Sequence, residues 1–164
     1  MTIDDYNALS VSDARALLEG CAQIAAWAEA VAAARPYADA AALLAYADDL
    51  AATWTDEQVS AALADHLRIG EKHAGAGAGA DHSSREQAGV DAHDAEIQRR
   101  LAEGNAAYEE RFDRIYLVRA AGRSAEEILT LLDERLTNDP ATELRVTAGQ
   151  LREIAVLRLQ GLVE

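Results

Sequence analysis

Two short blocks of polar and small residues stand on either side of an alanine–glycine run. The first block, His66 to Glu71, reads HLRIGE, and the second, Ser83 to Val90, reads SSREQAGV. The imidazole of His66 can donate and recover a proton near neutrality, and the Glu86 carboxylate can orient a ligand. These residue types predict acid–base chemistry. Each also fits a structural role, because histidine suits a helix C-terminus and Ser83 with Glu86 matches a capping box.

The last predicted helix carries a third candidate, Arg158. Apolar residues recur there at steps of four and three, which places them on one face with the arginine: Leu144, Ala148, Leu151, Ala155, Arg158 and Leu162. A guanidinium buried without a partner is very costly, so we expect it to meet a carboxylate, a group of backbone carbonyls or a ligand. From the residues alone, a structural salt bridge and a ligand contact both fit.

The elements that must position these residues are predicted to be helices, and the fold class is an all-α, single-domain bundle over residues 1–164. Residues 115–118 have strand propensity but no partner strand, so we interpret them as a buried extended link or a helix end. Residues 74–80 have no bulky side chain, and we expect a mobile loop over about 73–82. Caps or capping boxes predict helices that start at Ser12, Thr55 and Ser124, and Asp139-Pro140 precedes the last helix. Further helices are predicted over about 22–35 and 39–53, from Ser84, and over 91–114 with a break at Gly104.

Composition and charge narrow the class of protein. With 15 basic and 29 acidic residues, the net charge is −14, which makes nucleic acid an unsuitable partner. The first residues lack a secretory signal, no apolar run is long enough to span a membrane, and Cys21 is the only cysteine. We therefore expect a cytoplasmic protein. The four histidines show no zinc-ligand spacing, and no phosphate loop, nucleophile elbow or dinucleotide fingerprint is present, so neither a metal nor a cofactor is expected.

The two blocks resemble the signature of the 2-oxo-4-hydroxy-4-carboxy-5-ureidoimidazoline (OHCU) decarboxylases. In that family His-Pro-Arg-Ile-Gly is followed about twenty residues later by Ser-x-x-Glu-Gln-x-Gly, and Glu86 falls twenty residues after His66. Further similar segments are Trp54-Thr55, Asn105-x-x-Tyr108-x-x-x-Phe112, 120–124, and 154–159, which contains Arg158. The similarity covers nearly the whole chain in the same order.

The resemblance implies decarboxylation of a small ureidoimidazoline to (S)-allantoin, without a cofactor, in urate degradation. It implies that His66, Glu86 and Arg158 are catalytic and that the protein is a homodimer. It also implies a set of substrate-binding positions, including backbone amides of a short segment: Leu67, Ser83, Gln87, Leu117, Val118 and Arg119.

Two positions depart from the family pattern. Leu67 stands where the family has proline after the histidine, and Asp113 stands where the family commonly has glycine after Phe112. Proline would restrict the backbone and remove an amide donor, so Leu67 changes how His66 is held. The alternative reading is therefore a non-catalytic helical interaction module that retains the family fold.

Overall fold

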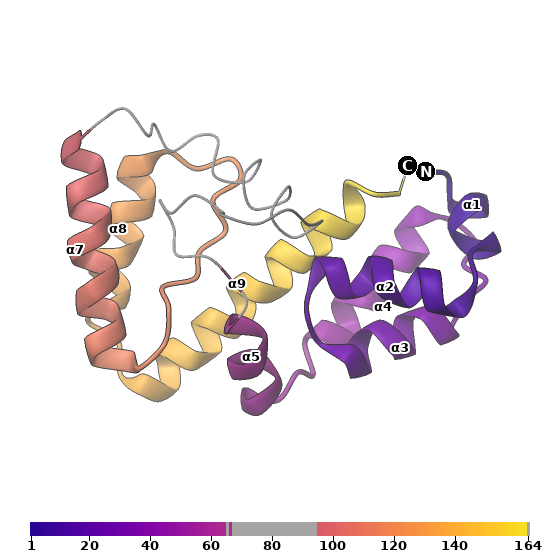
Figure 1. Cartoon of the computed structure of the whole chain (residues 1–164), viewed down its shortest axis with the longest axis horizontal. Coiled ribbons are helices and arrows are strands. Elements are labelled where there is room, and N and C mark those ends of the chain that lie inside the picture. Colours follow the sequence, from indigo (N-terminus) through magenta and orange to yellow (C-terminus); the bar gives the residue numbers. More distant parts are fainter. Residues whose placement is uncertain (65, 67–94, 164) are drawn as a thin grey trace. The chain divides into compact units, whose positions relative to one another are not determined.

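The structure is a computed structural model that describes residues 1–64, 66 and 95–163. This described part contains eight helices and no strand (Figure 1). The prediction of an all-α fold is confirmed. The chain divides into two compact units, one formed by Met1–Ala62 with Leu151–Glu164 and the other by Leu63–Gln150. The last helix contributes residues to both units, and each unit is described on its own below.

Local capping residues begin most helices of the first unit. The helices are α1 (Ile3–Ala8), α2 (Val11–Cys21), α3 (Ala25–Ala33), α4 (Ala40–Ala51) and α5 (Asp56–Leu63). Asp39 caps α4, and Thr55 forms the predicted capping box with Gln58 at the start of α5. The predicted cap at Ser12 was wrong, because Ser10 Oγ accepts a hydrogen bond from the Asp13 amide and α2 begins two residues earlier.

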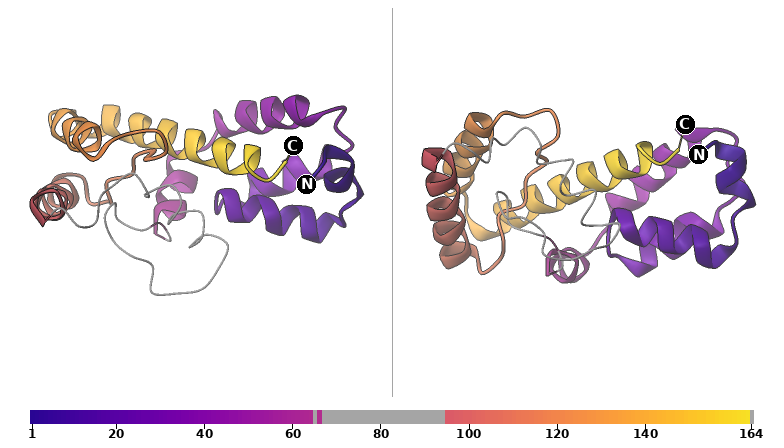
Figure 2. Two further views of the ribbon diagram at one scale, coloured as in Figure 1. Left: turned by 90° about the horizontal axis from the view of Figure 1, so that it is seen from above. Right: turned by 45° about the horizontal axis from the view of Figure 1, so that its top comes forward.

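The first unit packs α2 against α3 and α3 against α4, as Figures 1 and 2 show. Its core contains large side chains that are almost fully buried, among them Tyr6, Leu18 and Leu43. The indole N–H of Trp27 donates to the Ala47 carbonyl at 2.9 Å, which ties α3 to α4. The two chain ends lie side by side, and the amino group of Met1 donates to the Leu162 carbonyl at 2.8 Å (Figure 1).

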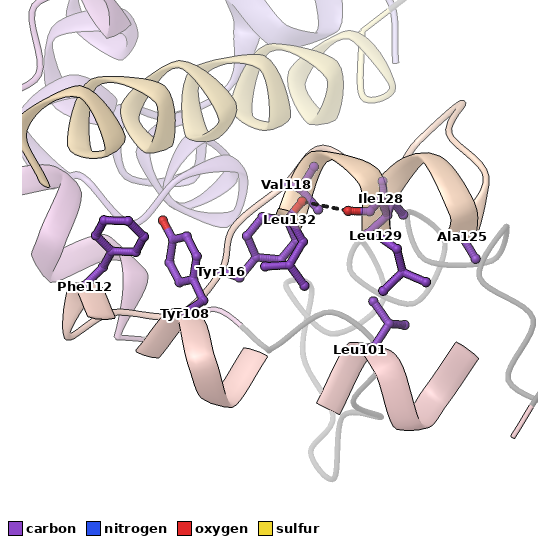
Figure 3. Close-up of a cluster of buried hydrophobic side chains, with 10 residues drawn as sticks. Leu101, Tyr108, Phe112, Tyr116, Val118, Ala125, Ile128, Leu129 and Leu132 are labelled. Atoms are coloured by element: carbon purple, nitrogen blue, oxygen red, sulfur yellow. Dashed lines mark hydrogen bonds between the residues drawn. The ribbon is translucent and has the colours of Figure 1, made fainter. Parts of the chain in front are cut away.

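The second unit is built on α7 (Ala95–Phe112), α8 (Ala125–Arg135) and the first half of α9 (Pro140–Gln160). Ser124 and Glu127 form the predicted capping box of α8, and Asp139 accepts amides of the first turn of α9. Figure 3 shows the core between these helices, in which the Tyr108 ring lies between those of Phe112 and Tyr116. Most of the cluster comes from α7 and α8, and its members are Leu101, Tyr108, Phe112, Tyr116, Val118, Ala120, Ala125, Ile128, Leu129 and Leu132.

Gly104 does not break α7, which runs through it without interruption, so the predicted break was wrong. A Cβ atom built at this position would lie 2.2 Å from Cδ2 of Leu132 in α8. The glycine therefore serves close packing between the two helices rather than flexibility. A neighbouring helix determines this role, and the sequence around Gly104 carries no sign of it.

Asp113 ends α7 in the left-handed backbone region, with φ of 52°. Its amide still bonds to the Glu109 carbonyl at 2.9 Å, so it completes the last helical turn before the chain changes direction. Glycine adopts this conformation at little cost, whereas a residue with a Cβ is strained there. This explains physically why glycine suits the position that Asp113 occupies.

The buried face of α9 differs from the predicted one in its first half. Leu151, Ala155 and Arg158 are buried as expected, but Leu144 and Ala148 are only half-buried. The buried positions of the first half are instead Glu143 and Thr147, each with 0% of its surface exposed. The prediction of a face that is apolar except for Arg158 was therefore wrong, because polar partners from other helices stabilise these two residues.

Candidate active site

Arg158 lies in the second half of α9 and is 7% exposed. Its Nη1 donates to the backbone carbonyl of Cys21 at 3.3 Å. Cys21 is the last residue of α2, where the carbonyl groups of a helix carry partial negative charge. The structure thus provides one of the expected partners of a buried guanidinium, a carbonyl group, and that bond orients the Arg158 side chain.

His66 lies in the turn after α5 and is half-buried. Its amide donates to the Leu63 carbonyl at 3.1 Å, which continues the C-terminal turn of that helix. The position agrees with the predicted place at the end of a helix. Four other predicted site residues, together with the loop over 73–82 and the helix predicted from Ser84, lie outside the described residues: Leu67, Ser83, Glu86 and Gln87.

The segment with the three predicted amide donors is a buried link between α7 and α8, without helix or strand. Leu117 is 5% and Val118 6% exposed and Tyr116 is also buried, whereas Ile115 is half-buried, so the predicted buried link is confirmed for residues 116–118. The described residues supply no acceptor for the amide hydrogens of Leu117 or Val118. Buried backbone N–H groups almost always have a partner, so two adjacent donors without one suit a ligand acceptor.

The third amide of this segment already has an acceptor. The N–H of Arg119 donates to Oε1 of Gln150 at 2.9 Å, and the same oxygen accepts Nη1 of Arg123 at 3.0 Å. Arg123 also donates to the Arg119 carbonyl at 2.8 Å. Both hydrogen-bonding groups of the Arg119 backbone are thus engaged within the protein, which leaves Leu117 and Val118 as the better candidates for binding a ligand.

A buried polar cluster beneath the link was not predicted from the sequence. Arg135, the last residue of α8, binds Glu143 of α9 through Nε at 2.7 Å and Nη2 at 2.6 Å. Nη2 also donates to Oγ1 of Thr147 at 3.1 Å, and the hydroxyl of Tyr108 donates to Glu143. The signal was present in the sequence as two polar residues four apart, Glu143 and Thr147, but their partners lie on α7 and α8.

The third nitrogen of the Arg135 guanidinium, Nη1, reaches the link. Nη1 of Arg135 donates to the Leu117 carbonyl at 2.6 Å, and the guanidinium lies 4.8 Å from the centroid of the Tyr116 ring. Burial, and then the hydrogen bond to Glu143, raises the pKa of Tyr108. Burial also raises the pKa of Tyr116, whose hydroxyl donates to the Ile128 carbonyl at 3.0 Å (dashed in Figure 3). Both phenols therefore stay protonated at neutral pH and act as hydrogen-bond donors.

Within the described part of the chain, no group of three or more histidine, cysteine or acidic residues is placed to hold a metal ion. None of the described helices is both long and apolar enough to cross a membrane. Among the described residues, the first unit presents the buried Arg158, and the second presents His66 and the amides of Leu117 and Val118. An arginine and backbone amides of this kind are donors suited to an anionic or strongly polar small molecule.

Comparison with known proteins identifies the class. Residues 7–160 match the family model described as OHCU decarboxylase, so the chain belongs to the OHCU decarboxylase family. The resemblance found in the sequence is thereby confirmed. The chain is 38% identical over 78 residues to the 2-oxo-4-hydroxy-4-carboxy-5-ureidoimidazoline decarboxylase of Amia calva, a match that covers 48% of this chain and 45% of that protein. It is 39% identical over 62 residues to the uric acid degradation bifunctional protein TTL of Arabidopsis thaliana, over 38% of this chain and 19% of that protein.

Solved structures with a similar fold include a member of the same family. A crystal structure of OHCU decarboxylase in the presence of (S)-allantoin has a TM-score of 0.73 and 25% identity, and the match covers 88% of this chain and 94% of that one. A crystal structure of (S)-allantoin synthase has a TM-score of 0.71 over 99% of this chain and 54% of that one, at 17% identity, which supports the fold alone. The chain spans less than half the length of the two curated relatives it matches.

Proposed function

We propose that this protein decarboxylates 2-oxo-4-hydroxy-4-carboxy-5-ureidoimidazoline to (S)-allantoin without a cofactor, in the degradation of urate. The observation that carries the proposal is the match of residues 7–160 to the OHCU decarboxylase family. The proposal is supported by the buried Arg158, held at the end of α2, and by the amides of Leu117 and Val118, for which the described residues supply no acceptor. The carboxylate and ring carbonyls of such a substrate can accept hydrogen bonds from these donors.

The reaction breaks one carbon–carbon bond and makes one carbon–hydrogen bond. As carbon dioxide leaves, the electron pair of the broken bond moves toward the adjacent ring carbonyl and forms an enolate. A proton then adds to the same carbon. The protein must stabilise the negative charge that develops on the ring oxygen and must deliver the proton to one face only. A preorganised donor to such a charge contributes about 3–4 kcal/mol.

Arg158 supplies this stabilisation in our proposal. A salt bridge to the departing carboxylate would be strongest before the reaction and would weaken as neutral carbon dioxide forms, which would slow the chemical step. We therefore assign the guanidinium chiefly to the ring oxygen that becomes enolate-like, with any carboxylate contact secondary. The bond from Nη1 to the Cys21 carbonyl supports this role, since it restricts the side chain before substrate binds.

His66 is the proposed general acid that protonates the carbanion. Its place in the turn after α5 holds the backbone through the bond to Leu63, and a half-buried imidazole can exchange its proton with solvent between turnovers. Glu86 is proposed to accept hydrogen bonds from the N–H groups or hydroxyl of the substrate. Ser83, Gln87 and Leu67 complete the proposed binding residues, together with the amides of Leu117 and Val118.

The test is circular dichroism of substrate generated in situ from urate by uricase and hydroxyisourate hydrolase. The substrate decays by itself to racemic allantoin, so a control without the protein ends with no optical signal from that product. We expect a fast and lasting (S)-allantoin signal with the wild type and its loss with His66→Ala. A wild-type trace that matches the control would refute the proposed activity.

That negative result would favour a non-catalytic helical interaction module, for which Leu67 is the specific observation. Leu67→Pro restores the family residue and would then show whether the leucine alone accounts for the lost activity.

The homodimer and the cytoplasmic location also belong to the proposal. Sedimentation at micromolar concentration tests the former, since a single species of monomer mass would contradict it.

A further inference from the structure

The second unit contains a buried polar cluster that the proposed chemistry does not use. It consists of Arg135, Glu143, Thr147 and Tyr108, and it buries two opposite charges. The side chains of Arg135 and Glu143 are 6% and 0% exposed. Burying both charges costs several kcal/mol, and apolar residues of similar volume often stabilise a fold equally well. Stability alone is therefore a weak explanation for an ion pair at this position.

The geometry of the guanidinium suggests what the cluster does. Nε and Nη2 face Glu143, and Nη2 also reaches Thr147, so the orientation of the planar group is determined by α9. The two hydrogens of Nη1 then point in fixed directions, and one of them meets the Leu117 carbonyl, at an Nη1-to-oxygen distance of 2.6 Å. Because the guanidinium is rigid and always charged, its bonds to α9 also fix where the Leu117 carbonyl of the link lies relative to that helix.

The Leu117 carbonyl and the Val118 amide belong to one planar peptide unit. In a trans peptide the C=O and the N–H point in opposite directions, so a carbonyl held by Arg135 directs the Val118 N–H away from the cluster. That N–H is one of the two donors for which the described residues supply no acceptor. A hydrogen bond of charged donor type holds this peptide plane more firmly than a neutral one would.

We propose that Arg135, held by Glu143, is a positioning residue that orients the Val118 amide as a hydrogen-bond donor to the substrate. The inference rests on the proposed function, in which this link forms part of the active site. Arg135 acts through the Leu117–Val118 peptide and does not itself touch substrate. Glu143 has the second role, because it selects the orientation of the guanidinium and neutralises its charge.

The decisive variant removes the ion pair without leaving a charge buried. In Arg135→Met/Glu143→Leu, apolar side chains fill the space, so the fold is expected to persist while the bond to Leu117 is lost. Arg135→Lys is the second variant, since an ammonium keeps the charge but cannot donate to Glu143 and Leu117 with the same fork geometry. Arg99→Met is the control, because the ion pairs that the structure describes for Arg99, with Glu96 and Glu103 on α7, are exposed.

The sequence provides a direct readout of this peptide. Leucine is followed by valine at two places only, 117–118 and 162–163. Protein labelled with carbonyl-¹³C leucine and ¹⁵N valine therefore gives two signals in a carbonyl-to-amide NMR experiment. The Val163 amide, bonded to the Leu159 carbonyl at 3.2 Å, serves as the internal reference. We expect the Leu117–Val118 signal to move in both test variants and the Leu162–Val163 signal to stay.

In the dichroism assay, both test variants should lose about tenfold to a hundredfold in kcat, with a smaller change in KM, while Arg99→Met matches the wild type. A merely structural role would lower the melting temperature and leave kcat of the folded fraction intact, which would overturn the proposal. The proposal would also be overturned if the Leu117–Val118 signal did not move in the test variants, or if it moved while kcat stayed at the wild-type value. An inactive wild type would refute the proposed function itself, and the positioning role would fall with it.

Discussion

Replacing Gly104 by alanine is expected to destabilise the protein, although alanine favours a helix over glycine by about 1 kcal/mol. The new Cβ would lie 2.2 Å from Cδ2 and 3.2 Å from Cγ of Leu132. Leu132 is 1% exposed within the core between α7 and α8, so its side chain has little room to move aside. Overpacking of such a core costs about 1–3 kcal/mol. The steric cost exceeds the gain in propensity, and we expect a net loss of about 1 kcal/mol.

Gly149 in α9 is the matched control. No described atom beyond its chain neighbours and its own helix backbone lies within 4 Å of a Cβ built there. Gly149→Ala therefore receives the gain in helix propensity without a steric cost, and should stabilise the protein by about 1 kcal/mol. The same substitution at two helical glycines is thus expected to act with opposite signs.

Urea unfolding followed by circular dichroism at 222 nm measures both changes from the midpoint and slope of the transition. The clash is tested separately in a Leu132→Ala background. Removing the leucine side chain removes the steric cost, so Gly104→Ala should become neutral or stabilising there. If Gly104→Ala stabilises the wild type as much as Gly149→Ala does, or has the same effect in both backgrounds, close packing is not the role of this glycine.

Three further outcomes are expected. Arg158→Lys keeps the charge but loses the planar fork, so kcat should fall by about tenfold or more, whereas Arg145→Lys on the exposed face of α9 should leave kcat unchanged in the same dichroism assay. Asp113→Gly should raise the free energy of unfolding by about 1 kcal/mol, because φ of 52° strains a residue with a Cβ; an unchanged urea midpoint would contradict this. The pKa of Asp48 lies below its usual value, chiefly because Arg152 donates to it at 2.6 Å. Folding therefore gains stability from Asp48 above its unfolded pKa near 4 and loses it as the pH falls toward the lower folded value. Asp48→Asn should accordingly cost no more than about 1 kcal/mol at pH 7 and nothing near pH 2, and an equal cost at both pH values would exclude the ion pair as the cause.

The starts of α5, α8 and α9 were predictable because their signals are local. The Thr55, Ser124 and Asp139 caps each bond within three residues, so the sequence window that suggests them also contains the partner. The short helix α1 was missed although Thr2 and Asp5 form a capping box of the same kind. It has only six residues, which is too short for apolar periodicity to appear.

The candidate site was predictable in part. Residue type and the break in apolar periodicity singled out Arg158, and the family resemblance assigned roles to His66 and to the amides of the link. The buried cluster was not found, because a polar residue on a predicted core face looks like an error in the pattern until its partners are known. Arg135 ends one helix and Glu143 lies in the next, and neither position alone indicates that they meet.

The sequence by itself determined the all-α class, the starts of α4, α5, α8 and α9, the family and the unusual arginine of the last helix. Tertiary structure alone decided that Gly104 faces Leu132, that Arg135 holds the Leu117 carbonyl, and that Arg158 meets the Cys21 carbonyl. The physical reason is the range of the contacts involved. Caps and helical periodicity act within about four residues, whereas the two arginine bonds join groups 18 and 137 residues apart, which only the packing of helices brings together.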